Sequence, residues 1–155
     1  MTLEQWAAVS TIAQAILVVI SLGFIWYQLR ESTKLAKAEN VRALVEQAAA
    51  FHAPLYQDGQ LGELWYTFGR KFRDDTEKLK YHEMIVQWLL FHENIYYQYS
   101  QGLLAEGIYQ SWLADLKVTM GEHNTDLIDI KGLFPGQYGL HLLELKEAFK
   151  TNEKH

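Results

Sequence analysis

Histidine and glutamate stand side by side twice in one stretch of the sequence, and these residue types can bind metals or move protons. The pairs are His82-Glu83 and His92-Glu93. A zinc-protease helix needs a second histidine four residues after the first, but position 86 is Val86. A di-metal carboxylate bundle needs Glu-x-x-His on facing helices, and the sequence contains no such motif. We therefore predict hydrogen-bonded histidines, no metal and no cofactor.

Nucleophilic catalysis and phosphate binding also lack their usual signatures. The sequence has no cysteine, so no thiolate is available as a nucleophile or zinc ligand. Ser100, Ser111 and Thr119 are isolated and have no nucleophile-elbow context. The glycine-rich segment 132–139, GLFPGQYG, has neither the Lys-Ser/Thr pair nor the preceding strand of a phosphate loop. We predict that the chain is not an enzyme.

The segment 91–104, FHENIYYQYSQGLL, combines a carboxylate, phenols and amides at helical spacing. Such groups can form a buried hydrogen-bond network that fixes how helices pack, which is the favoured interpretation. The alternative is a small polar pocket for a ligand, walled by aromatic rings. We predict a buried polar cluster or pocket made of Glu93, Asn94, Tyr97, Gln98 and Trp112.

The segment from Trp6 to Tyr27 contains no charged residue over 22 positions. As a helix it is about 33 Å long, enough to cross a hydrocarbon core of about 30 Å. A cleaved signal peptide is disfavoured, because no Lys or Arg precedes the apolar run and the run is too long. We predict a transmembrane helix over residues 1–29, with interfacial anchors at Trp6, Trp26, Tyr27 and Arg30.

The charges on either side of this segment indicate its direction in the membrane. Only Glu4 precedes it, whereas four basic residues follow it: Arg30, Lys34, Lys37 and Arg42. By the positive-inside rule, the N-terminus lies outside and residues 30–155 form a cytoplasmic domain. The net charge of -5 argues against nucleic acid as a partner.

One side of the predicted transmembrane helix carries polar and small residues at heptad spacing. Gln14 and Ser21 are seven residues apart, and a primary amide in hydrocarbon favours a partner on another helix. A conducting pore is disfavoured. We predict membrane lipid and either a homo-oligomer or a larger membrane complex as partners, with contacts through Ala7, Thr11, Gln14, Val18, Ser21 and Ile25.

The sequence downstream shows helical periodicity and no alternation of period two, which predicts an all-α fold. One long helix is expected over residues 3–52, with 30–53 as its cytoplasmic continuation and Pro54 ending it. A bundle of four to five helices follows, including 61–68, a largely buried 77–101, 105–120 stopping at Gly121, and 138–149. Residues 70–78, RKFRDDTEK, are expected to be a solvent-facing connection. The expected apolar side of the cytoplasmic continuation is Leu35, Ala38, Val41, Val45, Ala48 and Ala49.

Five segments follow one another along the chain: LEQW, YQLRESTK, LWYTFGR, FHENIYYQYSQGLL and YQSW. In these the chain resembles a widespread family of uncharacterised bacterial single-pass membrane-anchored helical proteins. The similarity weakens after Met120, where residues 126–136 do not reproduce the family's pattern. The resemblance implies a bacterial inner membrane, one N-terminal span and a helical cytoplasmic domain, without an activity or cofactor.

Together these features predict an interaction protein anchored by one membrane span. It would be an accessory or scaffold subunit of a membrane complex that also self-associates. The alternative is a small-molecule sensor tethered to the inner membrane, which would use the cluster around Glu93 and Tyr97.

Overall fold

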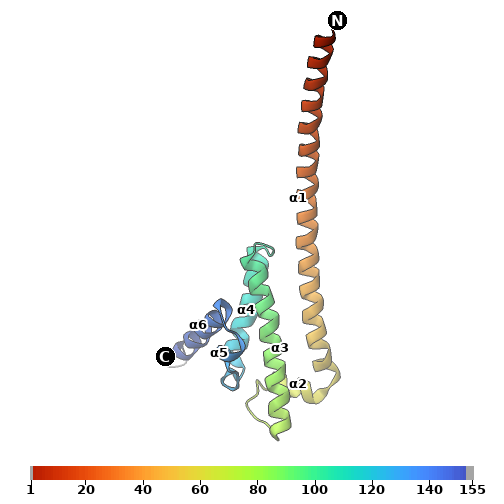
Figure 1. Cartoon of the computed structure of the whole chain (residues 1–155). Coiled ribbons are helices and arrows are strands. Elements are labelled where there is room, and N and C mark those ends of the chain that lie inside the picture. The colour runs from red at the N-terminus through yellow and green to blue at the C-terminus, as the bar shows by residue number, and fades with distance from the viewer. Residues whose placement is uncertain (1, 153–155) are drawn as a thin grey trace. The chain divides into compact units, whose positions relative to one another are not determined.

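The computed structural model describes residues 2–152, apart from the side chains of residues 8, 9 and 150–152. This part of the chain is helical without a strand, which confirms the predicted all-α fold. A 3-10 turn, η1 (Thr125–Leu127), lies between the fourth and fifth helices. The α-helices are α1 (Leu3–Gln57), α2 (Gly59–Tyr66), α3 (Asp75–Ser100), α4 (Glu106–Glu122), α5 (Ile130–Leu133) and α6 (Gln137–Asn152) (Figure 1).

The chain divides into two units, Met1–Glu39 and Asn40–His155, and α1 is continuous through both. In the first unit, each described side chain from Ser10 to Arg30 is exposed. Exposure continues over residues 32–39, so burial in the second unit begins about ten residues after the predicted membrane end at 29. The second unit contains the bundle and its core.

The part of α1 in the second unit packs through one line of apolar residues. Leu44, Ala48 and Leu55 are buried, and Phe51 is partly buried against them. Of the predicted apolar side, Ala48 is buried and Val41 is half-buried, whereas Leu35, Ala38, Val45 and Ala49 are exposed. Val45 directly follows Leu44, and one residue turns a helix by about 100°, so the two side chains cannot share a face.

The expected end of α1 at Pro54 was also wrong, because the helix continues to Gln57. Pro54 has no N–H to donate to the preceding turn, but its carbonyl still accepts from the amide of Asp58 at 2.9 Å. The Asp58 carboxylate then caps α2 by accepting from the amides of Gln60 at 2.8 Å and Leu61 at 3.3 Å. Asp58 therefore fixes where α1 stops and α2 starts.

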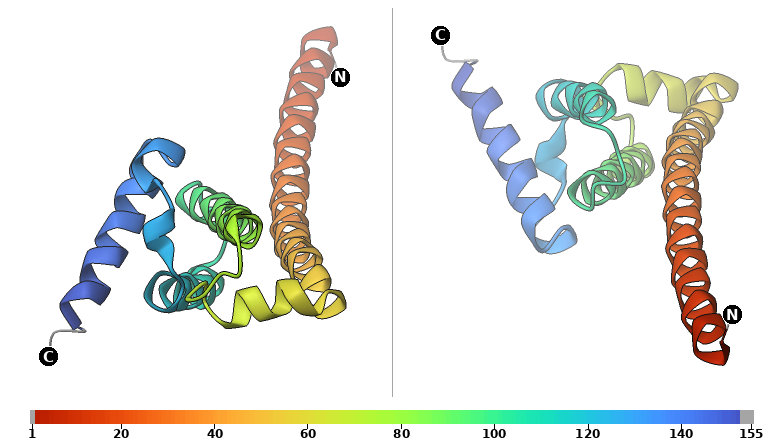
Figure 2. Two further views of the ribbon diagram at one scale, coloured as in Figure 1. Left: turned by 90° about the horizontal axis from the view of Figure 1, so that it is seen from below. Right: turned by 90° about the horizontal axis from the view of Figure 1, so that it is seen from above.

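Helix α3 is the centre of the bundle, as predicted. Tyr81, Ile85 and Leu89 are fully buried along it. Helices α2 and α4 pack against α3, and α6 packs against α4 and α5, as the two views of Figure 2 show. Asp74 caps the start of α3 through the amide of Glu77 at 2.8 Å.

Gly102 and Gly121 were both expected to end helices, but only Gly102 follows a helix end. Gly102 follows α3 with φ +71°, the left-handed conformation typical of a residue after a helix. Gly121 was expected to stop α4, but the helix passes through it to Glu122. The ring of Phe149 lies where a Cβ of Gly121 would be, within 2.9 Å. Gly121 thus lets α6 approach α4 closely.

Candidate functional site

The predicted contact stripe lies along an exposed side of the first unit. The hydroxyl of Thr11 donates to the carbonyl of Ala7 at 3.0 Å, and that of Ser21 donates to the carbonyl of Leu17 at 2.8 Å. These hydroxyls therefore need no external partner. Among the described residues, the amide of Gln14 has no hydrogen-bond partner, so it is a polar group that a neighbouring chain would satisfy. Val18 and Ile25, also on the stripe, are 58% and 50% exposed.

The opposite side of the same helix carries the aromatic and basic residues. The guanidinium of Arg30 lies 5.7 Å from the ring centroid of Trp26, a cation–π contact. Lys34 and Lys37 lie on this side as well. Each residue turns a helix by about 100°, so positions 26, 30, 34 and 37 point roughly away from the stripe at positions 14, 21 and 28. The predicted anchors Trp6, Trp26 and Tyr27 are all more than half exposed. A second helix on the stripe would leave the cations facing outward.

The predicted buried polar cluster on α3 is dispersed in the structure. Asn94 is exposed and Tyr97 is 41% exposed, so their predicted burial is wrong. Ile95 marks the buried side of α3, and Asn94 and Tyr97 are about 100° and 200° of helical turn away from it. Gln98 donates to the Asn94 side-chain oxygen at 3.2 Å, within the same helix. Among the described residues, these side chains make no hydrogen bond to another helix.

Glu93 and Trp112, the remaining members of that cluster, lie in separate surroundings. Glu93 is half-buried, and desolvation raises the pKa of its carboxyl. Burial, and then the charge of Glu93, raise the pKa of Tyr138, whose hydroxyl donates to the carbonyl of Leu89 at 2.9 Å. The ring of Trp112 instead packs edge-on against Phe91, 5.1 Å between centroids. The predicted five residues therefore do not form one site.

Buried histidines occupy the core between helices. His92 Nε2 lies 3.0 Å from Asp115 Oδ2, and His123 Nδ1 lies 2.9 Å from the hydroxyl of Tyr81. Burial lowers the pKa of His123 to about 4. Burial also lowers the pKa of His52, whose Nδ1 has no partner among the described residues. In residues 2–152 no three histidine, aspartate or glutamate side chains are placed to hold a metal ion.

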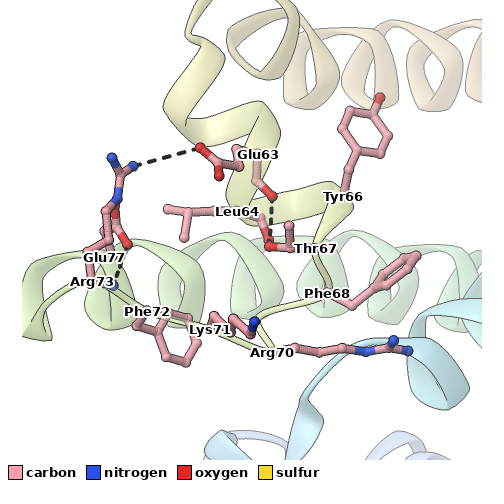
Figure 3. Close-up of a pocket in the computed structure, with 10 residues that line it drawn as sticks. All are labelled: Glu63, Leu64, Tyr66, Thr67, Phe68, Arg70, Lys71, Phe72, Arg73 and Glu77. Atoms are coloured by element: carbon pink, nitrogen blue, oxygen red, sulfur yellow. Dashed lines mark hydrogen bonds and ion pairs between the residues drawn. The ribbon is translucent and has the colours of Figure 1, made fainter.

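A groove of about 690 Å³ lies between the end of α2 and the connection to α3 (Figure 3). Its apolar surface includes Leu64, which is buried, and Phe72, which is half-buried against the ring of Tyr81. Tyr66, 55% exposed, and the half-buried Phe68 add aromatic surface. This volume falls in the range of small-molecule sites.

Charged side chains surround this groove. Arg73 pairs with Glu77 and lies 3.9 Å from Glu63 at one end of it (Figure 3). At the other end the guanidinium of Arg70 lies 5.4 Å from the ring centroid of Phe68. This site was not predicted, because residues 70–78 were expected to be only a charged, solvent-facing connection. The available signal was three cations interleaved with two phenylalanines over residues 68–73.

The connection between α2 and α3 has unusual backbone torsion angles, which hydrogen bonds from Asn124 stabilise. Phe68 and Gly69 have φ of +56° and +62°, and a positive φ is rare for an aromatic residue. The backbone amide of Asn124 donates to the carbonyl of Phe68 at 3.0 Å, and its side chain donates to the carbonyl of Gly69 at 3.2 Å. The ring of Tyr81 lies so close to Gly69 that a Cβ there would clash. The groove is thus preformed.

Comparisons with protein-family models, with curated proteins and with solved structures found no match to this chain. Its function is therefore inferred from its own residues.

Proposed function

We propose that this chain is a single-pass membrane protein that acts through protein–protein contacts rather than catalysis. It would be a self-associating accessory or scaffold subunit of a bacterial inner-membrane complex, with its helical domain in the cytoplasm. The observation that carries the proposal is the apolar half of α1. This segment is long and apolar enough to cross a membrane, and each of its described side chains from Ser10 to Arg30 is exposed.

The direction of insertion follows from charge. Arg30, Lys34 and Lys37 come directly after the apolar segment, while the charged residue nearest its other end is Glu4. Basic residues favour the cytoplasmic side, so the N-terminus would lie outside. The contact between Arg30 and Trp26 supports an interfacial position for both side chains. The bacterial inner membrane is part of the proposal because of the sequence resemblance described above.

Self-association is proposed to occur through the stripe around Gln14. In lipid, small and polar residues allow helices to approach and to hydrogen-bond across the contact. The amide of Gln14 is available for such a bond, whereas the hydroxyls of Thr11 and Ser21 are satisfied within their own helix. The cations on the opposite side would face lipid headgroups instead of repelling one another at the contact.

Replacing Gln14 with leucine is expected to weaken self-association about 3- to 30-fold, because an interhelical hydrogen bond in a membrane contributes about 0.6 to 2 kcal/mol. The strength of self-association is measured by energy transfer between two labelled populations of the protein in liposomes, over a series of protein-to-lipid ratios. Ile16→Leu, an equally apolar change on the far side of the helix, is the matched control. Equal association of Gln14→Leu and the unaltered protein would contradict a role for this amide.

The alternative of a small-molecule sensor centred on Glu93 and Tyr97 gains no support from the positions of these residues. Tyr97 is 41% exposed, and Glu93 lies instead beside Tyr138. The groove near α2 is lined by other residues.

A further inference from the structure

We propose that the groove between α2 and α3 binds a small apolar molecule that carries a single carboxylate. Nothing in the membrane assignment requires this site, because its residues all belong to the second unit. Three features support it: an apolar surface of suitable size, one cation without an ion pair among residues 2–152, and a backbone held in a strained conformation.

The apolar surface of the groove is complementary to the apolar part of the proposed ligand. Leu64 is 4% exposed, and Phe72 contacts the ring of Tyr81 at 5.6 Å between centroids, so both are fixed by the core below. Tyr66 and Phe68 also line the groove. A groove of about 690 Å³ accommodates an aromatic ring or a short aliphatic chain. The hydroxyl of Thr67 is directed to the carbonyl of Glu63 at 2.8 Å, so it is already engaged within α2 (Figure 3).

The charged side chains around the groove determine which polar group of a ligand can bind there. Glu77 pairs with Arg73, and Glu63 lies 3.9 Å from the same guanidinium. Arg70 lies 3.5 Å from Glu122 and over the ring of Phe68. Lys71 lies between these two ends and has no ion pair within residues 2–152 (Figure 3). The charged side chains that line the groove, three cations and two carboxylates, carry a net charge of +1, which matches one carboxylate better than a doubly charged phosphate.

The backbone explains why the groove is open before a ligand arrives. Phe68 has φ +56°, and such strain persists only where surrounding contacts enforce it. Here Asn124 holds the carbonyls of Phe68 and Gly69, and Tyr81 fills the space beside Gly69. Strained non-glycine residues of this kind cluster at ligand sites. A preformed groove also reduces the ordering cost of binding.

The test uses the full chain in phosphatidylcholine nanodiscs and three water-soluble probes of one shape: 4-phenylbutyrate, 4-phenylbutan-1-ol and 4-phenylbutylamine. Saturation-transfer NMR gives the dissociation constant of each. We expect the carboxylate to bind at least tenfold more tightly than the alcohol, and the amine to bind least. Lys71→Gln should weaken carboxylate binding about tenfold and leave alcohol binding unchanged.

Lys78→Gln is the matched control, because Lys78 is exposed on α3 and does not line the groove. It should leave carboxylate binding unchanged. Tyr66→Ala, at an exposed position, tests the apolar surface without disturbing the core and should weaken the carboxylate and the alcohol alike. Equal binding of the three probes, no binding of the carboxylate, or equal effects of Lys71→Gln and Lys78→Gln would overturn the proposal. None of these results depends on whether the chain self-associates.

Discussion

Replacing both Leu17 and Ile20 with lysine is expected to release the protein from the membrane. Each charge at the centre of a span costs about 2.5 to 3.5 kcal/mol of insertion free energy, so the pair costs about 5 to 7 kcal/mol. This corresponds to at least a thousandfold change in partitioning. The fraction of protein retained in carbonate-washed membranes measures the effect. Both side chains are more than 60% exposed, so the change disturbs no contact within the chain.

The matched control is Leu35→Lys, which places a charge on the same helix beyond the proposed span. Leu35 is 72% exposed, and this variant should remain in the membrane fraction. Retention of the double lysine variant in washed membranes would contradict anchoring by this segment. Intact mass of the membrane-bound protein separates an anchor from a signal peptide, because cleavage would remove the apolar residues.

Acidification from pH 6.5 to 4 is expected to destabilise the bundle, chiefly through His123. The folded state holds the pKa of this imidazole at about 4 by desolvation, against 6.5 in the unfolded chain. The unfolded state therefore binds the proton first, and stability falls as pH drops between these two values. The shift corresponds to about 3 kcal/mol. His52 and His141, whose pKa values burial also lowers, act in the same direction.

Other groups modify this pH dependence without reversing it. Asp115 raises the pKa of His123 and so partly opposes the desolvation. Glu93 acts the other way, because its raised carboxyl pKa makes the folded state bind a proton more readily as pH falls. Denaturant midpoints at pH 7, 5.5 and 4.5 measure the net effect. His123→Gln, whose amide oxygen can still accept from Tyr81, should lose much less stability over this range. An equal loss in the variant would remove His123 as the cause.

Helices and their central member were predictable because they depend on local spacing. Tyr81, Ile85 and Leu89 recur at helical steps, and all three are fully buried. The end of α1 was not predictable from Pro54 alone, since the cap at Asp58 decides where the chain turns. The packed face of α1 was not predictable either, because apolar residues follow one another there and periodicity alone could not choose Leu44 over Val45 or Ala48 over Ala49.

Local sequence patterns do not predict which side chains pair with one another in the core. His92 meets Asp115 and Tyr81 meets His123 across 23 and 42 positions of sequence. The spacing of these residues in the sequence predicts neither pair. The polar residues of α3 illustrate the opposite error: Asn94, Tyr97 and Gln98 formed a clear pattern, but the buried side of the helix at Ile95 points elsewhere. The groove near α2 arises from a backbone turn at Phe68 that no sequence motif specified.

The most direct test of membrane-embedded self-association through the stripe is a cysteine scan of α1. The natural sequence has no cysteine, so single replacements from Ser10 to Leu35 each introduce one reporter. Oxidative cross-linking in native membranes should give dimers with a period of about 3.5 residues and maxima at 14, 18, 21, 25 and 28. Minima should fall at 16, 19, 23, 26 and 30. Uniformly absent cross-links, or maxima on the side of Trp26 and Arg30, would contradict the proposed contact.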